Sequence, residues 1–454
     1  MTFMSINPAS GETLPSVEPW GEARLEQALA KAALTAPLWA GHSPAERACL
    51  LGRLAPLLRA EQDLLARLIT QEMGKLLRES RAEIEKCAWG CEHYAEHGVA
   101  SLADEHVTTD ASQSYVTFQP LGTVLAIMPW NFPFWQVFRC ALPALLVGNT
   151  VLLKHASTVF NCALAIEALF VKAGFPEGVF QNLIITSDEV GKVIADPRVH
   201  AVSLTGSVAA GRQVAGLAGI HLKKLVLELG GSDPFIVLDD ADLEFTVQHA
   251  VAARFQNAGQ SCIAAKRFIV TPAIAEAFIE RFQHAVEQLS PGDPMLESTT
   301  LAPLARISQR DVLHQQVTDS IAYGAVPVTG CVPLPGTGAY YAPSILDHVG
   351  HQTRAYHEEL FGPVACVIRA SDEEDAVRIA NDTRFGLGGS VWTRDTARGE
   401  RLARRLQCGL AFVNGVVKSD PRLPFGGVKD SGYGRELSLY GLREFVNIKT
   451  VWIK

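Results

Sequence analysis

Residues Val124-Leu125-Ala126-Ile127-Met128-Pro129-Trp130-Asn131-Phe132-Pro133 open the part of the chain that decides the fold. The first five form an uninterrupted apolar run, which is typical of a strand buried on both faces of a sheet. Four similar runs follow, at residues 151–153, 179–185, 201–204 and 225–227. Segments of helical length separate them, at residues 138–147, 159–173, 189–195 and 209–217. The alternation predicts parallel strands with crossover helices, and therefore a doubly wound nucleotide-binding sheet.

The residues before this region have a different pattern. From about residue 21 to 98, leucines and isoleucines recur at helix spacing among Arg, Glu and Gln, which predicts a helical scaffold. One helix start is well marked at Ser43-Pro44-Ala45-Glu46. Ser43 suits the N-cap, Pro44 suits the first helical position, and Glu46 is placed to complete a capping box.

The residues after Gly230 repeat the alternating pattern. Apolar runs at residues 235–238, 267–270, 326–329, 364–368 and 410–414 predict a second α/β unit. Two segments fall outside both units, at residues 114–118 and 446–453. Each reads as an amphipathic strand, and exposed strands of this kind favour pairing with another chain.

Three fragments carry the groups that covalent chemistry at a carbonyl carbon requires. Phe255-Gln256-Asn257-Ala258-Gly259-Gln260-Ser261-Cys262 sets a cysteine behind a glycine-bearing turn rather than on an apolar face. Leu227-Glu228-Leu229-Gly230-Gly231 supplies a carboxylate between apolar neighbours, and Asn131 supplies an amide donor. Cys262, Glu228 and Asn131 are therefore candidates for nucleophile, general base and oxyanion donor.

Size and composition narrow the function classes. The chain has 454 residues, a net charge of −8 and no dense Lys/Arg run with aromatic residues, which argues against a nucleic-acid partner. No apolar run reaches the roughly 18 residues of a membrane span, and no signal-peptide pattern opens the chain. Nine scattered cysteines favour a reducing compartment, so we expect a cytoplasmic protein. Cys87, Cys91 and His93 lack a second ligand pair, so no metal site is predicted.

With these fragments and others in the same order, the chain resembles the NAD(P)-dependent aldehyde dehydrogenases over nearly its whole length. The others are Leu152-Leu153-Lys154, Thr205-Gly206-Ser207, Glu359-Leu360-Phe361-Gly362-Pro363, Pro424-Phe425-Gly426-Gly427-Val428-Lys429 and Ser431-Gly432-Tyr433-Gly434-Arg435-Glu436. The resemblance implies an α/β fold with a Rossmann-like cofactor-binding domain at residues 1–110 and 122–229 and a catalytic domain at 230–435. It also implies a small β oligomerisation domain from residues 111–121 and 436–454, and hence a homodimer or homotetramer.

The resemblance also implies a mechanism. Cys262 would attack a small-molecule aldehyde to form a thiohemiacetal, whose oxyanion the Asn131 amide and the Cys262 backbone N–H would hold. After hydride transfer to the cofactor, Glu228 would activate the water that hydrolyses the thioester. A catalytically silent structural member of the family, and an unrelated thiolase-like or amidase-like cysteine enzyme, are the alternatives from other classes.

The cofactor implied by the resemblance is NADP or NAD. The G-x-G-x-x-G fingerprint is absent, but Gly206-Ser207-Val208-Ala209-Ala210-Gly211 fits the family's variant, in which a helix start binds the phosphates. The other residues carried over are Lys154 at the adenosine ribose, Trp130 in the cofactor cleft, Glu359 at the nicotinamide ribose and Phe361 near the nicotinamide. Ser157 stands where NAD-selective members often have Glu, so NADP is expected to be accepted. His155 either adds positive charge beside the phosphate or is structural.

The substrate is indicated by Arg139, a charge in an apolar helix eight residues after Asn131. Succinate-semialdehyde dehydrogenases use an arginine at this position to bind the substrate carboxylate, and the chain resembles the short bacterial branch of these enzymes most. One departure is Gln256, where other such enzymes carry a second arginine. Oxidation of succinic semialdehyde is therefore the expectation, with another aliphatic or aromatic aldehyde as the alternative. A structural ion pair is the competing interpretation of Arg139.

Overall fold

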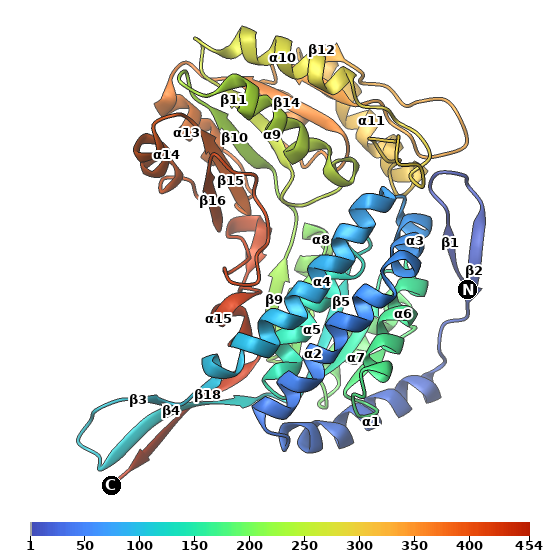
Figure 1. The fold of residues 1–454 in the computed structure, drawn as a ribbon, viewed down its shortest axis with the longest axis vertical. Helices are drawn as coiled ribbons and strands as arrows, with labels where there is room; N and C mark the ends of the chain where they lie inside the picture. The colour runs from blue at the N-terminus through green and yellow to red at the C-terminus, as the bar shows by residue number, and fades with distance from the viewer. Residues whose placement is uncertain (1) are drawn as a thin grey trace.

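The structure is a computed structural model that describes residues 2–454. Figure 1 shows two α/β bodies, one above the other, with a narrow β arm extending from the lower body and ending at the C-terminus. An N-terminal hairpin of β1 (Phe3–Ile6) and β2 (Thr13–Val17) lies along the side of the molecule. The α/β fold predicted from the sequence is confirmed. No helix within residues 2–454 combines the length and apolar character needed to cross a bilayer.

The lower body is built on a six-stranded sheet in the order β17-β9-β8-β5-β6-β7. All neighbours are parallel except the edge strand β17, which is antiparallel to β9. The strands are β5 (Thr123–Met128), β6 (Thr150–His155), β7 (Phe180–Asn182), β8 (Ala201–Thr205), β9 (Lys224–Glu228) and β17 (Gly432–Tyr433). The chain runs outward from β5 in one direction and resumes at β8 in the other. A topological switch point, where doubly wound sheets bind ligands, therefore lies between β5 and β8.

Helices cover both faces of this sheet (Figure 1). They are α1 (Glu22–Ala40), α2 (Pro44–Ala60), α3 (Gln62–Met73), α4 (Leu77–His97), α5 (Trp135–Leu146), α6 (Phe160–Lys172), α7 (Val190–Ala195), α8 (Val208–Ile220) and α15 (Ser438–Leu442). The capping box at the start of α2 is confirmed, because Ser43 Oγ accepts from the Glu46 N–H and the Glu46 carboxylate accepts from the Ser43 N–H.

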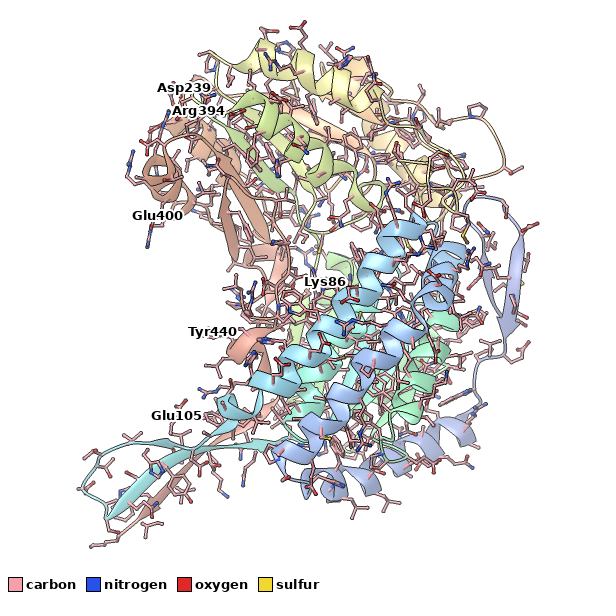
Figure 2. All side chains as sticks on the ribbon, viewed as in Figure 1. Lys86, Glu105, Asp239, Arg394, Glu400 and Tyr440 are labelled. Atoms are coloured by element: carbon pink, nitrogen blue, oxygen red, sulfur yellow. The ribbon has the colours of Figure 1, made fainter. Side chains whose placement is uncertain are left out.

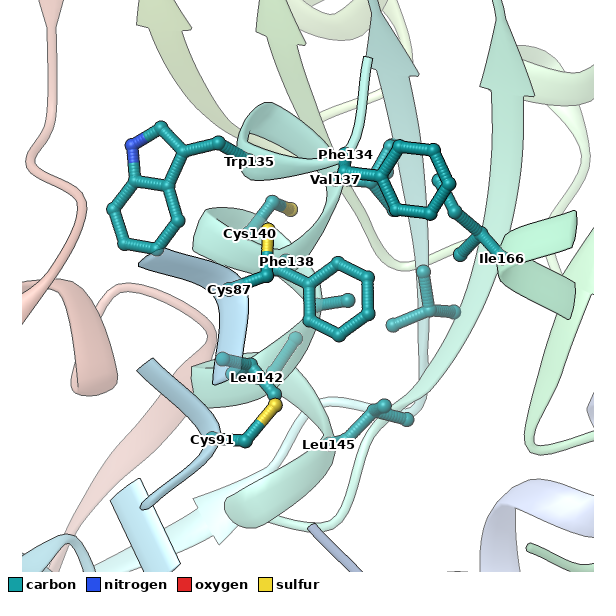
Figure 3. Close-up of a cluster of buried hydrophobic side chains, with 14 of the residues drawn as sticks. Cys87, Cys91, Phe134, Trp135, Val137, Phe138, Cys140, Leu142, Leu145 and Ile166 are labelled. Carbon is teal, nitrogen blue, oxygen red and sulfur yellow. The ribbon is translucent and has the colours of Figure 1, made fainter. Parts of the chain in front are cut away.

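Helix α5 is buried along its entire length, and Figure 3 shows why. Phe138 and Leu142 of α5 pack against Cys87 and Cys91 of α4, so these two cysteines act as small core residues. Trp135, at the start of α5, belongs to the same buried cluster. Rigid packing on this side fixes the side chains that α5 presents toward the site described below.

The upper body contains a seven-stranded sheet in the order β12-β13-β14-β11-β10-β15-β16, parallel except at β12. Its strands are β10 (Asp233–Val237), β11 (Ala265–Val270), β12 (Val326–Thr329), β13 (Ser344–Asp347), β14 (Val364–Arg369), β15 (Gly388–Trp392) and β16 (Leu410–Val413). Its helices are α9 (Leu243–Phe255), α10 (Ala275–Glu287), α11 (Ile307–Ala322), α12 (Arg354–His357), α13 (Glu373–Asn381) and α14 (Thr396–Ala403). The sequence did not predict β13 or β15.

The arm is a three-stranded antiparallel sheet in the order β18-β4-β3. Strand β18 (Val446–Ile453) pairs with β4 (Gln113–Pro120) in unbroken register, and β3 (Glu105–His106) adds the other edge. Ile448, Trp452 and Ile453 of β18 are exposed. Both segments predicted as separate strands are therefore strands, and they pair with each other. The domain boundaries drawn from the sequence stay a prediction.

Candidate active site

Two cavities meet at Cys262, which lines both of them together with Gln136. One cavity, of about 260 Å³, opens over the switch point of the lower sheet and is lined by residues that follow β5, β8 and β9. We call it the cofactor cavity. The other, of about 180 Å³, lies between α4, α5 and the segment after β16, and we call it the substrate cavity. Cys262, the candidate nucleophile, is therefore reached from both cavities.

The turn before Cys262 holds three consecutive residues in the left-handed region. Asn257, Ala258 and Gly259 have φ of 53°, 51° and 74°. An alanine pays a steric cost there, and such strain persists only where the surroundings enforce it. They do so here: Asn257 Nδ2 donates to the Asn131 carbonyl at 2.9 Å, and the buried Arg254 guanidinium donates to the Gly259 and Gly362 carbonyls.

The surroundings of Cys262 favour the protonated thiol. Burial raises its pKa to about 12, and the positive charges of Arg139 and Lys266 oppose this only in part. Lys266 Nζ lies 2.8 Å from both the Ser261 and the Cys262 carbonyls, so it fixes the backbone of the nucleophile. The thiol must therefore lose its proton to a base during the reaction.

Asn131 is held directly beside this turn. It is 5% exposed, Nδ2 donates to the Gln260 carbonyl at 3.0 Å, and Oδ1 accepts from Gln136 Nε2 at 2.9 Å. With the Oδ1 atom engaged, the amide is locked with its nitrogen toward the Cys262 loop. The amide therefore presents a donor, as an oxyanion site requires.

Glu228 ends β9, and its carboxylate is buried with both oxygens lacking hydrogen-bond partners among the described residues. Burial raises its pKa well above the usual carboxyl range, and the carboxylate of Glu436 raises it further. Such a group is poised to take up a proton near neutral pH. A side chain at Gly426 would come within 2.6 Å of Glu228 Oε1, which explains the glycine in the Pro424–Lys429 motif.

The cofactor cavity brings together Trp130, Gly206, Ser207, Glu359 and Phe361. The rings of Trp130 and Phe361 meet edge to face at 5.9 Å. Glu359 accepts from the Gly231 N–H at 3.1 Å, and a side chain at Gly230 would collide with its carboxylate. The pair of glycines after Glu228 is therefore needed for close approach of this carboxylate.

One residue of this cavity was missed in the sequence analysis. Gln309, on α11, lines the cofactor cavity, and its Oε1 is buried with no partner within residues 2–454. A buried unpaired amide oxygen is costly unless a ligand donates to it. No motif surrounds Gln309 in the sequence, so only the fold reveals it.

The adenosine end is expected at Lys154 and Ser157. Lys154 is buried near the end of β6, burial lowers its pKa, and Ser157 follows two residues after the strand. Ser207 is the N-cap of α8, where its Oγ accepts from the Ala210 N–H, so this helix start is available to an anion. His155 is structural: Nε2 donates to the Pro133 carbonyl, Nδ1 accepts from the Ala156 N–H, and burial lowers its pKa to about 4.

Arg139 lines the substrate cavity but has a protein partner. Its Nε is ion-paired with the Glu436 carboxylate, both side chains are 3% exposed, and the guanidinium lies 4.3 Å from the centre of the Phe425 ring. Although burial alone would lower it, the carboxylates of Glu436 and Glu228 raise the pKa of Arg139. The structure thus contains the ion pair that was the alternative interpretation of Arg139. That Arg139 binds the substrate stays a prediction.

Comparison with known sequences agrees with this site. The family model described as "Aldehyde dehydrogenase family" matches residues 1–451. The chain is 50% identical to a succinate semialdehyde dehydrogenase [NAD(P)+] of Escherichia coli strain K12, over 99% of this chain and 97% of that protein. It is 48% identical to a probable succinate-semialdehyde dehydrogenase [NADP(+)] of a Synechocystis species, over the full length of both.

Comparison with solved structures gives the same result. A crystal structure of the succinic semialdehyde dehydrogenase of Streptococcus pyogenes, in complex with NADP+, aligns with a TM-score of 0.98 at 37% identity and covers 99% of each chain. Full-length likeness in sequence and fold, around a cysteine set between two cavities, establishes the relationship. The chain belongs to the aldehyde dehydrogenase family.

Proposed function

We propose that this protein oxidises succinic semialdehyde to succinate with NADP+ or NAD+. The observation that carries the proposal is the cationic lining of the substrate cavity: Lys75, Lys86, Arg139 and Lys418 outnumber Glu79 and Glu83. Burial raises the pKa of Glu79, which further reduces the negative charge. An aldehyde that carries a carboxylate at its far end suits such a cavity.

The residues divide the reaction between them. Cys262 releases its thiol proton to solvent as Sγ bonds to the aldehyde carbon, and the Asn131 amide stabilises the oxyanion. Glu228 removes a proton from the water that attacks the thioester left by hydride transfer, and this proton passes to Sγ as the acid leaves and the thiol is restored. Its raised pKa matches this task, because a base works best near the operating pH.

The cofactor fits the cofactor cavity, which offers the unpaired Gln309 amide oxygen, the Glu359 carboxylate and the start of α8. Bound NAD(P)+ supplies an acceptor for the hydride of the thiohemiacetal carbon. Ser157, at the position expected to face the ribose, lacks the negative charge that would repel a 2′-phosphate, so both cofactors are expected to bind.

A panel of aldehydes tests the proposal. Succinic semialdehyde should give the highest kcat/KM with NADP+, well above butanal, which has the same chain length without the carboxylate. Equal kcat/KM for the two aldehydes would contradict the proposed substrate while leaving the family unaffected.

We also propose that the arm joins copies of the chain into a homodimer or homotetramer. The outer edge of β18 is unpaired within residues 2–454, and the exposed Ile448 and Trp452 lie on one face of it. Trp452→Glu should shift the molecular mass measured by light scattering toward that of the monomer.

The nine cysteines are all free thiols, which supports a location in the cytoplasm.

A further inference from the structure

Lys266 is a buried cation on β11, four residues after Cys262. Its side chain is 1% exposed, and its Nζ is surrounded by oxygen atoms. It lies 2.8 Å from the carbonyls of both Ser261 and Cys262, and 3.3 Å from the Ala264 carbonyl and the Glu359 carboxylate. All four groups are acceptors, so the ammonium form, with its three N–H donors, fits this environment.

Glu359 balances the charge of this ammonium. A buried cation is costly unless an opposite charge lies beside it. Burial lowers the pKa of Lys266, and the carboxylate of Glu359 opposes this change. Glu359 lines the cofactor cavity, whereas Lys266 lines neither of the two cavities that meet at Cys262. The ion pair therefore holds a positive charge beside the nucleophile but outside both cavities.

The peptide group between Ser261 and Cys262 is held at its oxygen and free at its nitrogen. Its carbonyl oxygen accepts from Lys266 Nζ and from the Ala264 N–H, the latter at 3.2 Å, which engages both lone pairs. Its N–H, which is that of Cys262, donates to no group within residues 2–454. A peptide group is planar, so contacts that hold its oxygen also restrict the direction of its N–H.

The charge of Lys266 acts on the same peptide group. A cation at a carbonyl oxygen polarises the group, and hydrogen bonds in a chain strengthen one another, so the N–H becomes a stronger donor. The carbonyl of Cys262 itself also accepts from Lys266. A side chain at Gly231 would come within 2.6 Å of this carbonyl oxygen, so the glycine leaves the space that the oxygen occupies.

We propose that Lys266 is a positioning residue that orients and polarises the Ser261–Cys262 peptide group, so that the Cys262 N–H stabilises the oxyanion together with the Asn131 amide. Lys266 acts through this peptide group and not by contact with a bound molecule. The inference rests on the proposed function, because it takes the Cys262 N–H as an oxyanion donor.

The next residue of β11, Arg267, provides a matched control. Its side chain is also buried, and successive side chains of a strand point to opposite faces. Its guanidinium donates to three carbonyls outside the turn that carries Cys262, those of Ser232, Ile379 and Ala380. Arg267→Met therefore removes a buried cation with three carbonyl partners and leaves the Ser261–Cys262 peptide group untouched.

Two reactions of the Cys262 thiol separate oxyanion stabilisation from thiol reactivity. With p-nitrophenyl acetate, Sγ bonds to the acyl carbon through a tetrahedral oxyanion before p-nitrophenolate leaves. With iodoacetamide, Sγ displaces iodide at carbon and no oxyanion forms. Both need the thiolate, whose formation the charge of Lys266 also favours. The ratio of the two rate constants cancels this shared requirement and reports on the oxyanion alone.

The first-turnover release of p-nitrophenol and the alkylation of Cys262, followed by mass spectrometry, give this ratio. In Lys266→Met it should fall about tenfold, less than the roughly 10²- to 10³-fold loss expected when an oxyanion donor itself is removed. Lys266→Gln, which keeps N–H donors without the charge, should show a smaller fall and tests the proposal if Lys266→Met does not fold. Arg267→Met should keep the wild-type ratio.

The outcomes separate this inference from the proposed function. Release of p-nitrophenol at the wild-type rate in Cys262→Ala would overturn Cys262 as the nucleophile, and with it both the proposed mechanism and the role of Lys266. If the reaction depends on Cys262, an unchanged ratio in the Lys266 variants overturns the role of Lys266 alone. An equal fall of the ratio in Arg267→Met would overturn it as well.

Discussion

The cofactor cavity and the substrate cavity share Cys262, yet different kinds of residues line them. The cofactor cavity lies at the ends of β5, β8 and β9, with Gly230 where a side chain would collide with Glu359. The substrate cavity is lined by charged as well as aromatic side chains, most of them from α4, α5 and the segment after β16. We infer that the shape of the strand ends determines cofactor binding, whereas the pairing of charges determines which aldehyde is accepted.

The largest effect is expected from a substitution of Cys262, where the two cavities meet. Cys262→Ala should lower kcat by a thousandfold or more, on the order expected for loss of a covalent nucleophile. NADPH binding, followed by quenching of tryptophan fluorescence, should be nearly unchanged because the cofactor cavity keeps its other contacts. Turnover close to that of the wild type would contradict the role of Cys262.

Glu228→Gln should affect a later step of the same reaction. The loss of the base should slow thioester hydrolysis by about 100-fold or more, so a burst of NADPH equal to the enzyme concentration should precede slow turnover. Rapid-mixing absorbance measurements resolve the burst. If the burst is absent, Glu228 acts before hydride transfer, on the thiol.

Arg139→Leu tests whether the buried ion pair on the substrate side is structural. Removing the guanidinium leaves Glu436 buried and unpaired, which should lower the free energy of unfolding by about 3 kcal/mol. Denaturant titration measures the loss, and Arg139→Leu combined with Glu436→Leu should recover most of it. A stable Arg139→Leu variant that loses only succinic semialdehyde turnover would instead support substrate binding by Arg139.

The smallest effect is expected on the cofactor side. Ser157→Glu should raise KM for NADP+ roughly tenfold or more and leave KM for NAD+ within about twofold, because it places a negative charge beside the 2′-phosphate. Initial rates with both cofactors give the comparison. Equal changes would mean that residue 157 does not face the adenosine ribose.

The contrast between the cavities also explains what the sequence could predict. The cofactor side follows from short contiguous motifs, because backbone at strand ends needs glycines and a helix start at fixed spacing, as in Thr205-Gly206-Ser207. The substrate side does not, since Glu436, the partner of Arg139, comes 297 residues later in the chain.

Some strands of the fold could likewise be predicted from the local sequence, and others could not. Apolar runs predicted most strands of both sheets, but β15 begins with Gly388 and Gly389, a pair that resembles a turn in sequence. Both positions are glycine because Asp233 and Pro234 of the neighbouring β10 occupy the space that side chains would need. Such a requirement comes from tertiary packing, which the local sequence does not encode.

The segment that leads into the C-terminal arm contacts the candidate catalytic groups, which has a practical consequence for handling the protein. Gly432 pairs with Glu228, Glu436 holds Arg139, and after the short helix α15 the chain enters β18, which is bonded along its whole length to β4. A purification tag or fluorophore fused after Lys454 would therefore be attached to a strand that follows closely, in the chain, the residues that contact Glu228 and Arg139. Labels are better attached on the exposed outer surface of the upper body, for example at Glu400 (Figure 2), where they leave this connection unstressed.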